Sequence, residues 1–374
     1  MKILHIGKYY SPIEGGIESI NKFVVESLQG SIQRILTFNN LNQSSENEVN
    51  GIPIVRAASK GVIASQPLSL KYFWEMKRYL DLFNPDIVHL HYPNPLAAFY
   101  LLLLNKRYKL IVHWHSDIVA QRFIHKVIKP IENKLLKRAD LIIATSPNYF
   151  EASLNLQKHK NKVTIIPCSI DEDRFELLDD DYEKINEIKQ QYNNKPIVFF
   201  IGRHVEYKGI RYLLEAESMV KEDCVFLIAG KGPLSDSLKT QFNSKRIHWL
   251  GRLTDDELKY YYYAATLFAF PSITRNEAFG VVLAEAMYCG CPALTFTIKG
   301  SGVNWVSINN FTGIESPNRD SKAFAMSIDK LLKDKDLLKL YGENAKGRVE
   351  LLFTKKKVSE LYRKAYNSLF ATNR

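Results

Sequence analysis

The chain has 374 residues and a formal net charge of +11, with 51 Lys and Arg against 40 Asp and Glu, and 46% of its residues are hydrophobic. That length exceeds what one hydrophobic core usually supports, so we expect two domains of roughly 190 residues each. Ordinary Gly and Pro contents, together with 12% aromatic residues, exclude a collagen-like, low-complexity or disordered chain.

Neither a membrane span nor a secretion signal is expected. The longest apolar run, Leu96–Leu104, has nine residues, whereas a bilayer needs about 20. The opening MKILHIGKYY is typical of a strand rather than a signal peptide, so we expect a cytoplasmic protein. Its four cysteines are expected to be free thiols. Cys289 and Cys291 are spaced too tightly for the usual zinc ligands, and no second pair exists to complete a site.

The positive charge is concentrated in the first half of the chain. Residues 1–170 carry 21 Lys and Arg against 12 Asp and Glu, and the remainder carries 30 against 28. We therefore expect only one domain to face an anionic partner. The sequence has no helix-turn-helix, zinc-finger or aromatic-basic ribonucleoprotein motif, so nucleic acid is not the expected partner.

Short β-branched runs alternate with helical stretches, a pattern that predicts parallel sheets covered by helices. In the first half we expect helices over residues 17–28, 68–82 and 119–137. The expected strands there are Lys2–Ile6, Gln33–Thr37, Ile54–Arg56, Asp86–His91, Leu110–His115, Leu141–Ala144 and Val163–Ile166.

The alternation lapses and then restarts in the second half. Residues 171–195 are acidic and poor in apolar side chains, which predicts an interdomain linker with its first helix. The strands expected after it are Ile197–Ile201, Val225–Ala229, Ile247–Leu250, Leu267–Phe270 and Ala293–Phe296. We therefore predict an α/β fold with two doubly wound domains, residues 1–170 and 196–356, and a terminal helix over 357–374 that can pack back on the first domain. Ligands of such sheets bind at the carboxyl ends of the strands.

Two loops at expected strand ends carry features that suit anions. Gly15 and Gly16 precede a helix start, where backbone amides and the helix dipole could meet an anion; a tight turn requiring positive φ is an equally good explanation. Arg203 and Lys208 follow the strand Ile197–Ile201 and could converge on one diphosphate. The alternative for this second pair is two loose surface cations.

The segment PSITRNEAFGVVLAEAMYCGCP is the most informative one. Glu285 lies eight residues after Glu277, so a fully helical span would stagger the two carboxylates by ~12 Å. That spacing suits hydroxyl groups at two ends of an elongated ligand better than a close acid/base pair. The amides of Phe279 and Gly280, at the expected start of a helix over residues 281–288, are placed for a phosphate. The alternative is a pair of ordinary helix-surface glutamates.

A histidine follows one central strand of the first domain. In IVHWHSDIV, strand alternation puts His113 and His115 on the same side, and His115 falls at the carboxyl end. We expect His115 to contact a ligand; a purely structural histidine is the alternative.

Two charged stretches have ordinary explanations beside functional ones. The run Asp179–Asp181 resembles a metal-binding motif, but its position in the expected linker favours a solvated charge run, and we expect neither a metal site nor a cofactor. Residues 118–138 interleave apolar side chains with Lys and Arg, as does a helix lying on an anionic membrane. An amphipathic helix packed on the sheet, interrupted by Pro130, is the alternative.

These segments together resemble glycosyltransferase family 4. The matching pieces are YYSPIEGGIE, VHWHSD, RADLIIATSPNY, PCSIDEDRF, GRHVEYKG, IAGKGPL, WLGRLTDDEL and NEAFGVVLAEAM followed by GCP. The resemblance covers essentially the whole chain, and KGSGVNWV with FTG after it resembles bacterial members that build surface polysaccharides. The family implies retaining enzymes with two facing Rossmann-like domains and a cleft between them, the GT-B fold. Ser169 departs from the glycine that the family usually has in its hinge.

The resemblance implies a role for each candidate residue. Arg203 and Lys208 would hold the diphosphate of the donor, and Glu285 would bind its ribose. Glu277, with the amides of Phe279 and Gly280, would hold the sugar and its phosphate.

Five further positions take roles from the same resemblance. The backbone around Arg252 and Leu253 would meet the base. Gly15 and Gly16 would let the first loop approach the diphosphate or the acceptor. His115 would contact the donor sugar near the reacting carbon.

The implied activity is metal-independent transfer of a hexosyl group from a nucleoside diphosphate sugar to a lipid-linked or oligosaccharide acceptor, in the synthesis of lipopolysaccharide or capsule. The enzyme would act at the cytoplasmic face of the membrane, peripherally bound to its anionic surface. Two alternatives stay open, namely a sugar-nucleotide epimerase and a non-catalytic subunit that binds a sugar nucleotide. The sequence does not identify the sugar, the base, the acceptor or the oligomeric state.

Overall fold

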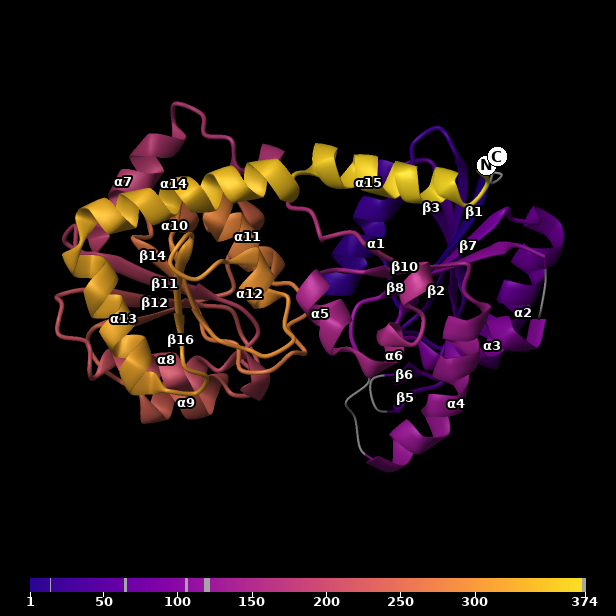
Figure 1. The fold of residues 1–374 in the computed structure, drawn as a ribbon, viewed down its shortest axis with the longest axis horizontal. Helices are drawn as coiled ribbons and strands as arrows, with labels where there is room; N and C mark the ends of the chain where they lie inside the picture. The colour runs from indigo at the N-terminus through magenta and orange to yellow at the C-terminus, as the bar shows by residue number, and fades with distance from the viewer. Residues whose placement is uncertain (14, 64–65, 105–106, 118–121, 372–374) are drawn as a thin grey trace. The chain divides into compact units, whose positions relative to one another are not determined.

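The computed structural model describes residues 1–13, 15–63, 66–104, 107–117 and 122–371, with the backbone alone over 122–127. Contacts between residues divide the chain into two units. The first comprises Met1–Pro167 with Val358–Arg374, and the second comprises Cys168–Lys357. Each unit is a sheet flanked by helices (Figure 1), which confirms the predicted α/β class.

The sheet of the first unit has the strand order β10-β9-β8-β7-β1-β2-β4-β3. Neighbouring strands are parallel, except that β3 runs antiparallel to β4. The strands are β1 (Lys2–Ile6), β2 (Ile32–Phe38), β3 (Ser45–Val49), β4 (Ile52–Ala57), β7 (Ile87–Tyr92), β8 (Lys109–Trp114), β9 (Leu141–Ala144) and β10 (Val163–Ile165). The edge strand β3 and the hairpin of β5 (Val62–Ile63) and β6 (Gln66–Pro67) were not predicted. The side chains of β3 and β5 are largely exposed, and β6 has only two residues, so none of the three shows the apolar pattern that marks a buried strand.

Helices of the first unit connect consecutive parallel strands, as right-handed crossovers require. They are α1 (Gly16–Ser27), α2 (Leu70–Arg78), which continues as the π-helical turn η1 (Tyr79–Phe83), α3 (Pro95–Leu104), α4 (Arg122–Arg138), α5 (Pro147–Ala152), α6 (Leu154–Gln157) and the 3₁₀ turn η2 (Lys160–Lys162). The apolar run Leu96–Leu104 is thus most of α3. Among the described residues, no helix combines the length and hydropathy that crossing a bilayer demands.

The sheet of the second unit is parallel throughout, in the order β13-β12-β11-β14-β15-β16. Its strands are β11 (Ile197–Ile201), β12 (Val225–Ala229), β13 (Ile247–Gly251), β14 (Leu267–Phe270), β15 (Ala293–Phe296) and β16 (Gly313–Ser316). Five of these agree with the prediction to within one residue, and β16 was missed. In β16, a Cβ on Gly313 would lie 1.8 Å from the carbonyl oxygen of Ala293. Close approach of the two strands therefore requires glycine, which propensity disfavours in a strand.

The helices of the second unit are α7 (Asp181–Gln191), α8 (Ile210–Glu217), α9 (Ser235–Gln241), α10 (Asp255–Ala264), α11 (Val281–Tyr288), α12 (Val303–Val306), α13 (Ser321–Lys333) and α14 (Lys335–Leu352), with the 3₁₀ turns η3 (Glu172–Phe175) and η4 (Glu206–Lys208). The last helix, α15 (Lys355–Ser368), begins in the second unit, and its residues from Val358 on belong to the first.

Residues 171–195, expected as a linker, belong to the second unit. Phe175 is fully buried there, against the ring of Tyr262. The acidic run that precedes α7 is only partly solvated: Asp181 is buried, accepts the N–H of Leu178 at 2.8 Å and pairs with Lys259. These two interactions, the backbone hydrogen bond first, lower the pKa of Asp181 to about 2. The prediction of a solvated charge run was wrong for Asp181, because composition does not show that Leu178 and Lys259 satisfy this carboxylate within the fold.

The strand orders show where, within each sheet, the order of successive strands reverses. In the first unit the reversal lies between β1 and β7, and in the second it lies between β11 and β14. Crossovers on either side of such a point run to opposite faces, so the loops after the two strands diverge and leave a crevice. Those four loops include Gly15, Arg203, Lys208 and Glu277.

Five histidines line one face of the first sheet. The register pairs His5 with His89 across β1 and β7, and His91 with His113 across β7 and β8. His115 follows β8, and its ring stacks on that of His113 with centroids 4.1 Å apart. All five are buried, and burial lowers the pKa of each, to about 4 for His5 and about 3 for His115.

This cluster predicts a steep loss of stability in mild acid. The pKa values of the folded protein lie below the unfolded value of about 6.5, so the unfolded chain binds more protons as the pH falls. The neutral histidines therefore make their full contribution to the free energy of unfolding above pH 6.5. From there toward pH 4 this free energy decreases by about 1.4 kcal/mol per histidine and pH unit. Urea unfolding at a series of pH values measures it.

His113→Phe provides the sharpest comparison. Neither ring nitrogen of His113 has a hydrogen-bond partner among the described residues, so the phenyl ring loses no such bond and removes one titrating group. We expect an unchanged or higher midpoint at pH 8 and a shallower decline toward pH 5. His159→Gln, a change at a more exposed histidine, should alter the slope less. Parallel pH profiles for His113→Phe and wild type would contradict the assignment.

Candidate functional site

An ion pair joins the two loops at the reversal point of the second sheet. Lys208 ends the turn η4 after β11, and Glu277 lies in the loop after β14; their side chains are in direct contact and are only 12% and 13% exposed. Ser272 donates a second hydrogen bond to the same Glu277 oxygen at 3.3 Å. The structure thus brings together two residues that lie 69 positions apart in the sequence.

Glycine allows this close approach. Gly209 has φ +64°, and a Cβ there would lie 2.0 Å from the carbonyl oxygen of Pro271. Only glycine permits both the backbone conformation and the contact. Lys208 is thereby held one residue from the point where the β11 loop touches the β14 loop.

Arg203 and Tyr207 belong to the same neighbourhood. The charges of Lys208, Glu277 and Arg203 all act on the hydroxyl of Tyr207, whose pKa is raised chiefly by burial. The ammonium of Lys208 lies 5.6 Å from the centre of the Tyr207 ring and 5.0 Å from that of Phe270. Arg203 itself is exposed at the strand end. Two cations and one carboxylate therefore share this edge of the sheet, an arrangement that can bind an anion with hydroxyl groups beside it.

The start of α11 lies directly after Glu277. Gly280 is the N-terminal cap at φ +91°, and a Cβ there would meet the Phe270 ring at 3.2 Å. The side chain of Phe279 is buried edge-on against Trp305 and Phe353. The ring of Phe279 is therefore not available to a ligand, and the contact through its backbone amide stays a prediction. Ser301 donates to the carbonyl of Glu277 and fixes the loop.

Glu285 is on α11, whereas Glu277 precedes that helix, so the fully helical span considered from the sequence does not exist. Glu285 is buried and accepts the Tyr262 hydroxyl at 3.0 Å. Burial raises its pKa, and the nearby charge of Arg174 opposes that effect. The carboxylate is thus satisfied within the unit, which rules out an ordinary surface glutamate.

The other predicted site residues of the second unit, Arg252 and Leu253, lie at the carboxyl end of β13. Arg252 is exposed and Leu253 half-buried, immediately after β13 and before the capping box of Thr254 and Glu257 that starts α10. His204, which is not one of the predicted site residues, is buried and bonds to Ser235 at 2.9 Å and to the carbonyl of Ala229 at 3.3 Å. It ties the loop after β11 to the loop after β12, a contact that no local sequence signal reveals.

In the first unit, Gly15 and Gly16 occupy the N-terminus of α1. Gly15 is extended, at φ 173°, and neither glycine has a φ in the left-handed region, so the tight-turn explanation is wrong. A Cβ on Gly15 would lie 2.2 Å from a carboxylate oxygen of Glu18. Burial raises the pKa of Glu18, and Lys8 lowers it. An acidic side chain already neighbours this helix start.

His115 is buried at the end of β8, where its Nε2 lies 3.0 Å from Nδ1 of His91. Two groups of described residues have ring nitrogens within 4.8 Å of one another, His5 with His89 and His91, and His91 with His113 and His115. Imidazoles so arranged could accept a transition metal. Neither group includes a carboxylate, and the His91–His115 hydrogen bond already uses two of the nitrogens. The run Asp179–Asp181 forms no such group among the described residues.

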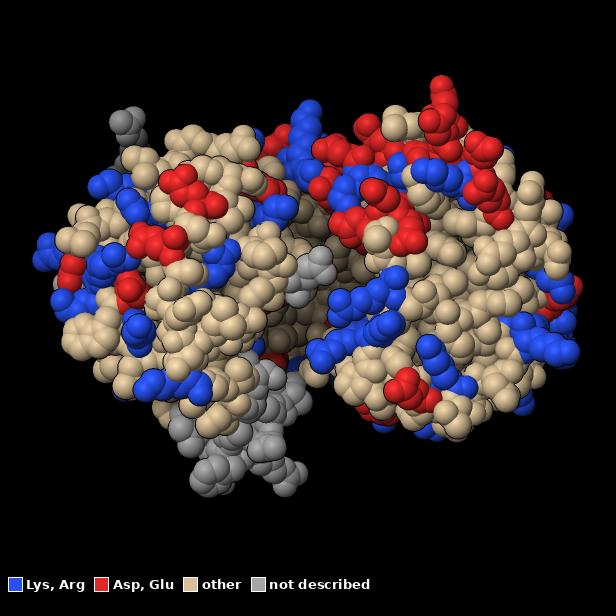
Figure 2. Space-filling view, turned by 180° about the vertical axis from the view of Figure 1, so that it is seen from behind, with Lys and Arg blue, Asp and Glu red and all other residues tan. Residues whose placement is uncertain are grey.

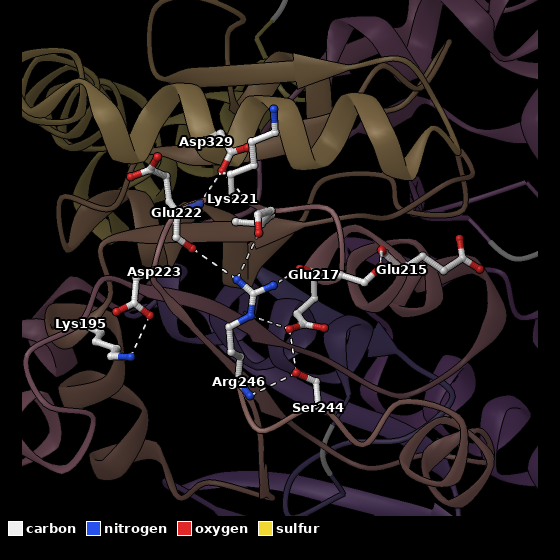
Figure 3. Close-up of polar contacts among 11 residues, drawn as sticks. Lys195, Glu215, Glu217, Lys221, Glu222, Asp223, Ser244, Arg246 and Asp329 are labelled. Atoms are coloured by element: carbon white, nitrogen blue, oxygen red, sulfur yellow. Dashed lines mark hydrogen bonds and ion pairs between the residues drawn. The ribbon is translucent and has the colours of Figure 1, made fainter.

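A second polar cluster stabilises the fold at the opposite edge of the same sheet (Figure 3). Arg246 precedes β13; its guanidinium donates to Glu217 at 2.7 Å and to the carbonyls of Val220 and Glu222. Asp329 accepts the N–H groups of Lys221 and Glu222. These residues lie at the amino ends of the strands, away from the carboxyl edge that carries Lys208.

Comparison with known proteins supplies the family. Residues 28–174 match the model described as Glycosyltransferase Family 4, and residues 181–348 match that of Glycosyl transferases group 1. The D-rhamnosyltransferase WbpZ of Pseudomonas aeruginosa is 30% identical, with 95% of this chain and 92% of that protein covered. This chain belongs to glycosyltransferase family 4. The O-antigen chain mannosyltransferase C of Escherichia coli is similar to this glycosyltransferase at 27% identity over 99% of both chains.

Solved structures show the fold of this glycosyltransferase. The sucrose-phosphate synthase of Thermosynechococcus elongatus superposes with a TM-score of 0.79 at 21% identity, covering 99% of both chains. HepE of Anabaena, solved in complex with UDP, gives 0.79 at 18% identity over 98% and 100%. The predicted pair of Rossmann-like GT-B domains is thereby confirmed.

The ion pair of this glycosyltransferase predicts a stability test. Lys208→Met leaves the Glu277 carboxylate largely buried without its cation, so we expect the free energy of unfolding to fall by about 3 kcal/mol. Adding Glu277→Gln removes that charge and should restore most of the loss. Urea unfolding of the two single variants and the double variant gives the coupling energy. Additive effects would show that the pair contributes nothing to stability.

Proposed function

We propose that this glycosyltransferase transfers a hexosyl group from a nucleoside diphosphate sugar to a lipid-linked or oligosaccharide acceptor, with retention of configuration, in bacterial surface polysaccharide synthesis. The observation that supports it most is the contact of Lys208 with Glu277 beside the strand end that also carries Arg203. Mannosyltransferase C and WbpZ are named for sugar transfer, and the former for the O-antigen chain.

Each group has a task in this proposal. Arg203 and Lys208 bind the diphosphate and stabilise the charge that develops on it as the glycosidic bond breaks. Glu277 accepts hydrogen bonds from sugar hydroxyls, the amides of Phe279 and Gly280 bind the phosphate, and Glu285 binds the ribose. Glu277 holds Lys208 in place, so little reorganisation is required when the donor binds.

We propose the remaining contacts with the donor and the acceptor from where the residues lie at the strand ends. Backbone at Arg252 and Leu253 meets the base, the loop at Gly15 and Gly16 approaches the diphosphate or the acceptor, and His115 contacts the donor sugar. We favour attack from the face that the diphosphate leaves, with the leaving phosphate taking the acceptor's proton. This mechanism needs no carboxylate behind the anomeric carbon.

Turnover of site variants tests the electrostatic role. Lys208→Ala removes one preorganised charge, so we expect kcat to fall by roughly 10²- to 10³-fold, measured as sugar transfer with a donor found by thermal shift, since a ligand of the native state raises Tm. Lys239→Ala, on α9 and away from the ion pair, is the control. Near-normal turnover of Lys208→Ala would contradict the proposal. Product formation from the donor alone would instead favour a sugar-nucleotide epimerase. Binding of the donor without sugar transfer would favour a non-catalytic subunit.

We also propose that transfer requires no metal ion. The charge on the diphosphate is balanced in this mechanism by Arg203, Lys208 and the start of α11. Turnover should therefore be unchanged after dialysis against a chelator, with metal content measured on the same sample. Activity lost on chelation and restored by a divalent cation would refute metal independence.

We propose that the first unit binds an anionic membrane. It carries 24 Lys and Arg against 13 Asp and Glu, whereas the second unit carries 27 of each, so the whole net charge resides in the first. On the face shown in Figure 2, Asp and Glu gather mainly on the second unit. Anionic lipids attract such a basic unit. The membrane helix was predicted over residues 118–138, of which the side chains of 118–127 lie outside the described residues; in the described part, Leu135 and Leu136 are fully buried.

The described surface offers an apolar face of its own. Leu70 and Trp74, one turn apart on α2, are 78% and 64% exposed, and Phe99 and Leu103, one turn apart on α3, are 41% and 58% exposed. The two helices pack together, with Phe73 of α2 edge-on to Tyr100 of α3. Exposed apolar side chains with a tryptophan among them suit the interface of a bilayer.

Vesicle binding separates this surface from its alternatives. With anionic vesicles at low salt we expect co-sedimentation that Leu70→Ser/Trp74→Ser weakens by tenfold or more, because two apolar side chains that would enter the bilayer are lost. Leu340→Ser in the second unit, at a side chain 50% exposed, is the matched control. Equal sedimentation of all three proteins would exclude the α2–α3 face, and wild type left in the supernatant would exclude membrane binding.

A further inference from the structure

A chain of ring contacts links the C-terminal helix to His115. Tyr366 of α15 hydrogen-bonds Nδ1 of His89. The ring of His89 stacks on that of His91 at 4.6 Å, with 13° between their planes. His91 in turn bonds through Nδ1 to Nε2 of His115. All four side chains are buried, so no solvent competes for these contacts.

The number of N–H protons on the two hydrogen-bonded rings shows what this arrangement does to His115. Burial keeps both His91 and His115 neutral at pH 7, so the two rings carry two protons between them. One proton lies in the hydrogen bond between them. The other is on the outer nitrogen of the accepting ring, either Nε2 of His91 or Nδ1 of His115. The bond therefore occupies Nε2 of His115 and couples the state of its Nδ1 to His91.

We propose that His91 is a positioning residue for the transfer reaction, fixing His115 so that Nδ1 alone is left for the substrate, and that Tyr366 and His89 hold His91 in place. The inference rests on the proposed function of His115 as a contact of the donor sugar. Nδ1 of His115 has no hydrogen-bond partner among the described residues. A buried ring nitrogen without a partner costs stability unless a ligand satisfies it.

The contact between Tyr366 and His89, at the far end of this series from His115, explains why the C-terminal helix α15 would matter to the reaction. Tyr366 keeps its proton because burial raises its pKa well above the usual value, so the hydroxyl can donate to Nδ1 of His89 and set that ring's tautomer. The plane of His89 then limits the plane of His91 through their stacking. Tyr362, one turn earlier on α15, lies against His113 instead, with ring centroids 6.0 Å apart.

Nitrogen NMR of the full-length protein tests this without any ligand. With ¹⁵N-labelled histidine, wild type should show one defined tautomer for His115. His91→Phe should convert it to an averaged mixture. His91→Asn should keep it, since the amide can replace Nδ1 of the imidazole in the hydrogen bond. A wild-type mixture, or a His115 signal unaffected by His91→Phe, would overturn the inference.

Kinetics provide the second readout. We expect His91→Phe to lower kcat by 10-fold or more with little change in KM, and His91→Asn to restore most of it. Tyr366→Phe should lower kcat several-fold and broaden the His115 signal, whereas Tyr362→Phe should do neither. Should His91→Phe fail to fold, the two tyrosine variants still decide, because equal effects of both would overturn the chain of contacts.

His115→Ala separates this inference from the function beneath it. If that variant keeps normal turnover, His115 has no part in transfer and its proposed role fails. If it is inactive while His91→Phe and Tyr366→Phe turn over normally with an unchanged His115 tautomer, the proposed function stands and the positioning role alone is refuted.

Discussion

The reversal of strand order between β11 and β14 is the constraint on which the second unit depends. It places two loops that are distant in the sequence side by side, and the contact between Lys208 and Glu277 then holds them. A largely buried lysine is tolerated there because a carboxylate neutralises it, and the carboxylate is tolerated because Lys208 and Ser272 satisfy it. Neither residue could occupy this edge alone without a large desolvation cost.

Much of the fold was predictable because both sheets are buried on two faces. Strands such as Ile197–Ile201 and Val225–Ala229 are continuous apolar runs, and their bounds agree with the structure. The failures share one physical cause: β3 is an exposed polar edge, β16 is defined by a glycine contact, and residues 171–195 join the second unit through few but specific buried groups. Periodicity reports burial of apolar side chains and is insensitive to such features.

The candidate site was predictable to a different extent. Residue types and spacing indicated Arg203, Lys208, Glu277 and Glu285, but not that Lys208 and Glu277 pair or that Tyr262 satisfies Glu285. Those partners lie 69 and 23 positions apart, and only the tertiary fold brings them together. The same holds for His91, which the sequence showed as part of a strand and the structure shows bonded to His115.

The two units differ in the buried polar groups around their candidate residues, although the first also pairs one buried carboxylate, Glu132 with Lys129 at 3.7 Å. The second keeps its charges and pairs them, as Lys208 with Glu277 and Arg246 with Glu217. The first buries five imidazoles as neutral rings and relies on stacking and hydrogen bonds to orient them. Charged pairs suit the binding of a diphosphate that we propose for the second unit, because the field is already in place when the ligand arrives. Neutral imidazoles suit recognition of uncharged hydroxyls, because each can donate at one nitrogen and accept at the other. In the proposed function, the paired charges of Lys208 and Glu277 serve the diphosphate and a sugar hydroxyl, and the neutral ring of His115 serves the sugar alone.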